Sequence, residues 1–130
     1  MILQTYLNFG GNCREAFEFY AASLNGTITA LMPHTGELSG VMHARLSLGQ
    51  TELLGSDVPD GRWQPMRSAY ISLSLDSTPE AERVFAALAA GGEIFMPIQE
   101  TFFAHRFAML RDRFGINWMI LHERPAPPQN

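Results

Sequence analysis

The side chains that could do chemistry are gathered toward the end of the chain. Between Met96 and Leu121 the sequence places Gln99, Glu100, Phe102, Phe103, His105, Arg106 and Trp118. A few polar groups set among aromatic side chains are typical of the lining of a small-molecule pocket. We therefore expect this stretch to contribute to a ligand-binding site.

Imidazole and carboxylate side chains are the candidates for acid–base chemistry or for holding a divalent ion. These candidates are His43, Glu52, Glu100 and His105. None of them shows a metal-binding spacing such as two His separated by three residues. For His43, a polar position at the outer edge of a strand is favoured over a role as pocket acid, base or ligand. For His105, a substrate contact and a loop histidine bonded to nearby backbone are equally open.

The remaining polar candidates have more ordinary expected roles. Glu100 could orient His105 or cap a hairpin, and His34 and His122 are expected to be solvated. Cys13 stands where a helix is expected to begin, and a helix dipole lowers the pKa of a thiol there. The sequence places no base near this thiol, so a small buried residue is favoured over a nucleophile.

Two further positions could contact a ligand. Trp63 lies in a polar stretch between Arg62 and Gln64, where it could cover a pocket or fill a dimer interface. The segment 70–75 alternates regularly, which puts Tyr70, Ser72 and Ser74 on one face of a strand. If that face is concave, its hydroxyls would line a cavity and orient a ligand rather than catalyse a reaction.

The elements that must position these residues follow the same order in both halves of the chain. The first half is expected to form a strand over residues 2–9, a helix, and strands over 27–32, 41–48 and 51–56. Asn12 with Glu15 predicts a capping box at the start of that helix, and Asn25 with Gly26 predicts its end. The second half is expected to form a strand over 70–75, a helix beginning at Ser77 or Thr78, and strands at about 93–99, 105–111 and 116–122.

The two halves also resemble each other in sequence. The segment beginning Glu15-Ala16 is similar to the one beginning Glu80-Ala81, 65 residues later in a chain of 130. This predicts an α+β fold of two βαβββ modules with curved mixed sheets around a cavity. The expected modules cover about 1–57 and 69–122 of a single domain over 1–122. Residues 58–68 are expected to link them, and 123–130 to form a Pro-rich tail.

Three segments carry a resemblance to a known family. They are Phe9-Gly10-Gly11-Asn12-Cys13, Gly55-Ser56-Asp57, and the pair Gln99–His105 with Arg113–Ile120. Together with the repeated βαβββ order, they resemble the vicinal oxygen chelate superfamily of glyoxalases, bleomycin-resistance proteins and dioxygenases. Within it, the chain is most similar to the PhnB-like group, whose members are often labelled by similarity to a ubiquinone methyltransferase. No methyl-donor site is present in the sequence, so we discount that activity.

The resemblance implies where a metal would be held. Metal-dependent members place His or Glu on the inner strands, at positions that fall near Thr5, Leu54, Tyr70 and Met119 in this chain. None of these side chains, nor a neighbour one residue away, is an imidazole or carboxylate. We therefore expect the usual metal centre to be absent and assign no cofactor.

Composition limits the partners. Apolar residues make up 46% and charged residues 17%, which is typical of a globular domain. The net charge is −4 and all nine cationic side chains are Arg, with no basic cluster that would bind nucleic acid. No apolar run is long enough to span a membrane. One cysteine and the lack of a signal sequence suit the cytoplasm.

These observations predict a cytoplasmic protein that binds a small organic molecule without a metal, and the resemblance implies a homodimer. The candidate ligand-binding residues are His43, Trp63, Tyr70, Ser72, Phe103, His105 and Met119. One alternative is a metal-dependent lyase, isomerase or dioxygenase that uses relocated ligands such as His43, Glu100 or His105. The other is a non-catalytic structural or regulatory dimer whose cavity is filled by side chains.

Overall fold

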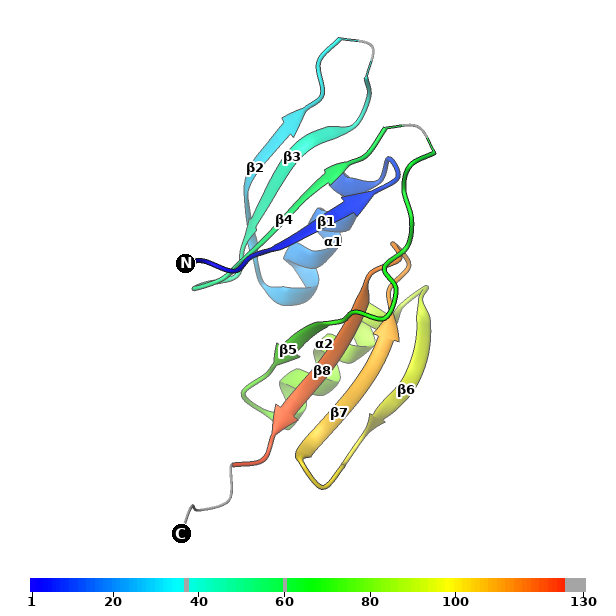
Figure 1. Ribbon diagram of the computed structural model, residues 1–130. Helices are drawn as coiled ribbons and strands as arrows, with labels where there is room; N and C mark the ends of the chain where they lie inside the picture. Colours follow the sequence, from blue (N-terminus) through cyan, green and yellow to red (C-terminus); the bar gives the residue numbers. More distant parts are fainter. Residues whose placement is uncertain (37, 60, 126–130) are drawn as a thin grey trace. The chain divides into compact units, whose positions relative to one another are not determined.

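The chain folds as two compact units that divide between Pro65 and Met66 (Figure 1). The computed structural model describes residues 1–36, 38–59 and 61–125, so residues 126–130 of the expected tail lie outside the described residues. Each unit consists of a four-stranded mixed sheet and one helix in the order βαβββ. The predicted α+β fold of two such modules is therefore confirmed.

The first unit contains one helix and four strands. These are β1 (Thr5–Phe9), α1 (Cys13–Leu24), β2 (Thr27–Pro33), β3 (Val41–Ser47) and β4 (Glu52–Asp57). The strand order across the sheet is β1-β4-β3-β2, with β1 parallel to β4 and the other pairs antiparallel.

The second unit repeats this arrangement. Its elements are β5 (Ile71–Ser74), α2 (Thr78–Ala89), β6 (Glu93–Gln99), β7 (Ala104–Arg111) and β8 (Asn117–Glu123). The order is β5-β8-β7-β6, again with only the first pair parallel. Neither α1 nor α2 combines the length and apolar character needed to cross a bilayer, and the described residues form no other helix.

In each unit the helix covers one side of the sheet, as Figure 1 shows. The strand residues on the α1 side are buried, and the ring of Phe9 packs edge-on against Phe17 of α1. Gly55 of β4 belongs to the same side, because an added Cβ there would lie 2.7 Å from the ring of Phe17. In the second unit, Arg106 of β7 reaches α2 through an ion pair with Glu82 at 3.0 Å. The opposite side of each sheet carries no helix of its own unit.

The start of α1 differs from the predicted capping box, because the side chain of Asn12 makes no cap hydrogen bond. The buried carboxylate of Asp57 replaces it. Its Oδ1 accepts the backbone N–H of Gly11 at 2.9 Å and of Cys13 at 3.0 Å, and its Oδ2 accepts the N–H of Val41 at 2.8 Å. Helix termini leave N–H groups without intrahelical partners, and here a carboxylate 44 residues away supplies the acceptor. The other helix ends follow expectation, with Asn25 left-handed at φ 55° and Ser77 capping α2.

A second buried carboxylate, Asp112, organises the turn between β7 and β8. Its Oδ1 accepts the N–H of Phe114 at 2.8 Å and of Ile116 at 3.1 Å. Its Oδ2 accepts the indole N–H of Trp118 at 2.8 Å. Trp118 is fully buried and belongs to the core of the second unit.

We expect Asp112→Ala to lower the free energy of unfolding by about 2–4 kcal/mol, because it leaves buried N–H groups without their charged acceptor. The exposed Asp76→Ala is the matched control and should change the free energy by less than about 1 kcal/mol. Urea denaturation followed by tryptophan fluorescence measures both. Equal, small effects in the two variants would show that Asp112 does not stabilise the turn.

Candidate functional site

The open face of each sheet is the side that the helix of its own unit does not cover. The strand register determines which residues belong to it. In the first unit Tyr6 pairs with Leu54, which pairs with Arg45, so these three side chains share one side of the sheet. Alternation along the strands adds the rest of this face. The first open face carries Tyr6, Asn8, His43, Arg45, Glu52, Leu54 and Ser56.

The first open face is mainly polar and its groups bond to one another. The hydroxyl of Tyr6 lies 3.3 Å from Nδ1 of His43, and the two rings stack with centroids 5.9 Å apart. Arg45 forms an ion pair with Glu52 at 2.9 Å. His43 therefore contacts the phenol of Tyr6 on β1, a partner that the sequence analysis did not identify.

The second open face has the opposite character. Met96, Met109 and Met119 are register partners across β6, β7 and β8, and Ser72 of β5 continues the row. The three methionines are half-buried and pack against the buried Phe107 and its neighbours Ala104 and Leu121. Three flexible thioethers in one row form an apolar floor that can adapt to what lies on it.

Aromatic rings mark both ends of the second open face. At one end the ring of Tyr70 meets that of Phe95 edge-on with centroids 6.4 Å apart, and the Arg111 guanidinium lies over Phe95 at 5.5 Å. At the other end the ring of Phe103 packs edge-on against Phe107 with centroids 5.1 Å apart. Phe103 is 41% exposed.

Four of the seven candidate ligand-binding residues are thus on this face or at its ends. They are Tyr70, Ser72, Phe103 and Met119. His43 and Trp63 belong to the first unit. His105 is at an irregularity in the pairing of β7 with β8, with its ring 5.0 Å from that of His122.

The structure corrects two expectations about polar side chains and adds a partner for a third. His34 and His122 are not simply solvated, because each is half-buried and bonds a backbone carbonyl oxygen. His34 Nε2 lies 3.0 Å from the oxygen of Asp57, and His122 Nδ1 lies 3.0 Å from that of Leu75. Glu100 forms an ion pair with Arg124 at 2.9 Å, a partner that the sequence analysis did not foresee.

The open faces can be tested for the metal centre of the metal-dependent family members. Of the four carried-over positions, Leu54 and Met119 are on open faces, whereas Thr5 pairs with Leu53 on the α1 side and Tyr70 precedes β5. The open-face residue next to Thr5 is Tyr6, and the open-face residue that follows Tyr70 is Ser72. These side chains offer no imidazole or carboxylate, the ligands that such an ion needs. Within residues 1–36, 38–59 and 61–125, no three His, Cys, Asp or Glu side chains are grouped to hold an ion. The residues at these positions therefore do not fit the metal centre of the metal-dependent members.

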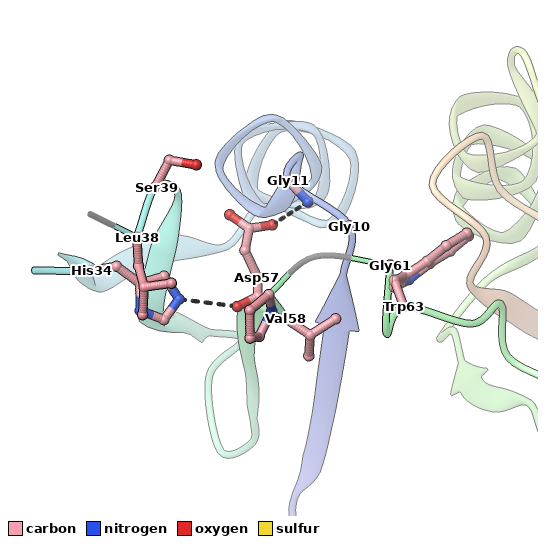
Figure 2. A pocket seen from close by; sticks show the side chains of 10 residues that line it. Gly10, Gly11, His34, Leu38, Ser39, Asp57, Val58, Gly61 and Trp63 are labelled. Carbon is pink, nitrogen blue, oxygen red and sulfur yellow. Dashed lines mark hydrogen bonds between the residues drawn. The ribbon is translucent and has the colours of Figure 1, made fainter. Parts of the chain in front are cut away.

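A cavity of about 400 Å³ lies elsewhere in the first unit, at the end of β4 (Figure 2). It is lined by Gly10, Gly11, His34, Leu38, Ser39, Asp57, Val58, Pro59, Gly61 and Trp63. Figure 2 shows His34 and Leu38 at one end of this Asp57 cavity and Trp63 at the other. Of these residues, sequence analysis identified only Trp63 as a candidate. The signal that could have found the rest is Gly10-Gly11 before a helix, combined with an Asp at the end of the strand parallel to β1.

Hydrogen bonds fix the walls of the Asp57 cavity. The backbone N–H of His34 donates to the oxygen of Gly40 at 3.0 Å, which closes the loop between β2 and β3. The indole N–H of Trp63 donates to the oxygen of Asn8 at 2.9 Å, and the Trp63 side chain packs over Gly10. With the three bonds of Asp57, these contacts hold the walls in place without a ligand.

The buried thiol of Cys13 lies next to this region. Burial, together with the smaller effect of the negative charge of Asp57, raises the pKa of this thiol to about 12. The effect of Asp57 and burial therefore outweighs the helix dipole considered in the sequence analysis. The favoured expectation, a small buried residue, is confirmed.

Comparison with known proteins agrees with the fold. Residues 3–120 match the model of the Glyoxalase/Bleomycin resistance protein/Dioxygenase superfamily, and the chain belongs to this family. It is 32% identical to Protein YjdN of Escherichia coli, over 99% of this chain and 100% of that protein. The crystal structure of PA1353 from Pseudomonas aeruginosa has a TM-score of 0.90 and 41% identity, over 96% of this chain and 99% of the other.

The expected similarity to the PhnB-like group is confirmed at the level of the fold. The PhnB protein from Bacillus cereus, described as a putative 3-demethylubiquinone-9 3-methyltransferase, has a TM-score of 0.84 and 24% identity. The match covers 94% of this chain and 99% of that one.

We expect Cys13 to resist alkylation in the folded protein. A pKa of about 12 in place of 9.0 lowers the thiolate fraction at mildly alkaline pH about a thousandfold, and the thiolate is the reactive form. The neutral thiol persists until the pH rises toward that raised pKa. The rate of reaction with iodoacetamide in buffer, compared with the rate in concentrated urea, measures this. Similar rates in the two conditions would mean that the thiol is exposed or activated.

Proposed function

We propose that this protein binds a small organic molecule on its second open face. The observation that carries the proposal is the methionine row Met96, Met109 and Met119, half-buried on a sheet face that its own helix leaves uncovered. Apolar surface of this kind gains free energy when a ligand removes it from water, and thioethers adapt to irregular shapes. Aromatic rings at both ends of the row favour a planar or elongated ligand.

Hydroxyl groups beside the methionine row support orientation of the ligand rather than catalysis. Ser72 is the register partner of Met119, and Ser74 follows it on the same face. Both serines are exposed, and Ser74 donates to the carboxylate of Glu123 at 3.1 Å. A few fixed polar groups at the edge of an apolar surface are the usual source of specificity in ligand sites. The homodimer and the cytoplasmic location stay predictions.

We expect Met119→Glu to weaken binding of such a ligand at least about tenfold, because it buries a charge against the ligand without a partner. A thermal-shift screen of aromatic and aliphatic small molecules would supply the ligands. Each compound that raises the melting temperature is then titrated against the variant by calorimetry.

Met42→Glu is the matched control for this experiment. Met42 is a methionine of the first unit, 45% exposed and outside both open faces. The Met42→Glu variant should bind the same compounds with the affinity of the unchanged protein. Equal affinity of the two variants for every compound would contradict the proposed location. A screen in which no compound raises the melting temperature would count against ligand binding itself.

The alternative of a metal-dependent enzyme makes a different prediction. After incubation with Zn, Ni, Mn or Fe(II) and desalting, we expect the protein to retain well below one ion per chain, because the positions that hold the metal in metal-dependent members carry no imidazole or carboxylate here. Elemental analysis measures the retained metal. Near-stoichiometric retention that is lost in His43→Ala or His105→Ala would support relocated ligands and an enzyme instead.

A further inference from the structure

The Asp57 cavity is a separate site from the open faces. Asp57 is the register partner of Phe9, so its side chain belongs to the α1 side of the sheet, whereas His43 and Arg45 project from the other side. We propose that this cavity binds a small organic cation of the amidinium or guanidinium class. The argument rests on the charge of Asp57, on the hydrogen-bonding groups that remain in the walls, and on the size of the space.

The carboxylate of Asp57 is only 4% exposed and takes its hydrogen bonds from backbone groups. Each ion pair found among the described residues involves a different carboxylate, so Asp57 forms no direct ion pair with an Arg of that part of the chain. Two carboxylate oxygens offer about four acceptor positions, and three are used. A buried charge without a cationic partner is costly, and a cation in the cavity would offset that cost.

Two further side chains of the cavity add acceptor capacity. Nε2 of His34 faces the carbonyl oxygen of Asp57, and since a carbonyl can only accept, this nitrogen carries a proton. In the neutral form of this imidazole, Nδ1 is then an acceptor. The Ser39 hydroxyl in the lining can accept as well as donate. The indole N–H of Trp63 is already donated to Asn8, so this side chain adds no free donor. Acceptors beside a carboxylate favour a ligand that is rich in N–H donors.

The space suits a small ligand with a planar charged end. A volume of about 400 Å³ is within the range of small-molecule sites. The polar groups of His34 and Asp57 lie toward one end of the cavity, and Trp63 stands at the other end (Figure 2). An arylamidine would place its amidinium beside the acceptors and its ring toward the indole. The net charge of −4 also favours the approach of cations over anions.

Three isosteric probes test the charge preference. Benzamidine is cationic, benzamide is its neutral analogue and benzoate is its anionic analogue. Titration of the ¹⁵N-labelled full chain, followed by amide chemical shifts, gives both the affinity and the location. We expect benzamidine to shift the amides of Gly10, Gly11, Ser39 and Gly61, and to bind at least about tenfold more tightly than benzamide, as expected for a charge-assisted hydrogen bond. Benzoate should produce no shifts at these positions.

Two histidine variants of the first unit locate the site. His34→Ala removes the ring from the cavity and should weaken benzamidine binding about tenfold or more, whereas His43→Ala on the first open face should leave it unchanged. Trp63→Leu provides a second cavity variant that should also weaken binding. Equal binding of benzamidine and benzamide, shifts confined to an open face, or an affinity that neither cavity variant changes would overturn the proposal. A change in benzamidine affinity in Met119→Glu, where the new carboxylate would attract the cation, would place the cation on the second open face instead.

Discussion

Each sheet in this protein is covered on one side by the helix of its own unit, and the rest of the structure depends on how the other side is used. Packing against α1 and α2 buries the apolar residues of one side, which supplies the core of each unit. The side chains of the open faces contribute less to that core and are free to differ. They do differ: the first open face is a hydrogen-bonded set around Tyr6 and His43, and the second is a methionine row. The repeat therefore preserves the fold while the two faces diverge in chemistry.

The loops of the two units also differ, as the buried carboxylates Asp57 and Asp112 show. Asp112 gives its oxygens to two backbone N–H groups and to the indole of Trp118, so the turn is closed around a core residue. Asp57 gives its oxygens only to backbone N–H groups of two different segments, and an open space remains beside it. The same device, a carboxylate accepting three N–H bonds, closes one region tightly and leaves a cavity in the other. At Asp112 the third donor is the large side chain of Trp118, whereas at Asp57 it is another backbone N–H group.

Much of the fold could be predicted from the sequence because the repeated patterns are local. The segments Ala44-Arg45-Leu46 and Ala108-Met109-Leu110 are similar in sequence and occupy equivalent strands, β3 and β7. In each segment the Ala and the Leu are fully buried on the helix side of the sheet. The site was harder to predict, since it depends on register and on distant contacts. Asn12 looks like a helix cap, but the acceptor comes from Asp57, far along the chain. An irregularity in the pairing of β7 leaves the ring of His105 next to that of His122, which alternation alone could not show.

This chain differs from the metal-dependent family members at the positions where those members hold the metal. Where metal-dependent relatives are expected to have His or Glu, the open faces here carry Leu54 and Met119. A thioether supplies neither the imidazole nor the carboxylate that such an ion needs and adds apolar surface, so the binding proposed for the second open face would come from contact area and shape. Met119 has Met109 beside it and Ser72 on its other side, so the exchange is part of a continuous surface and not an isolated substitution. A ligand held on that surface would be selected by the rings at its two ends, because the floor between them can adapt to many shapes.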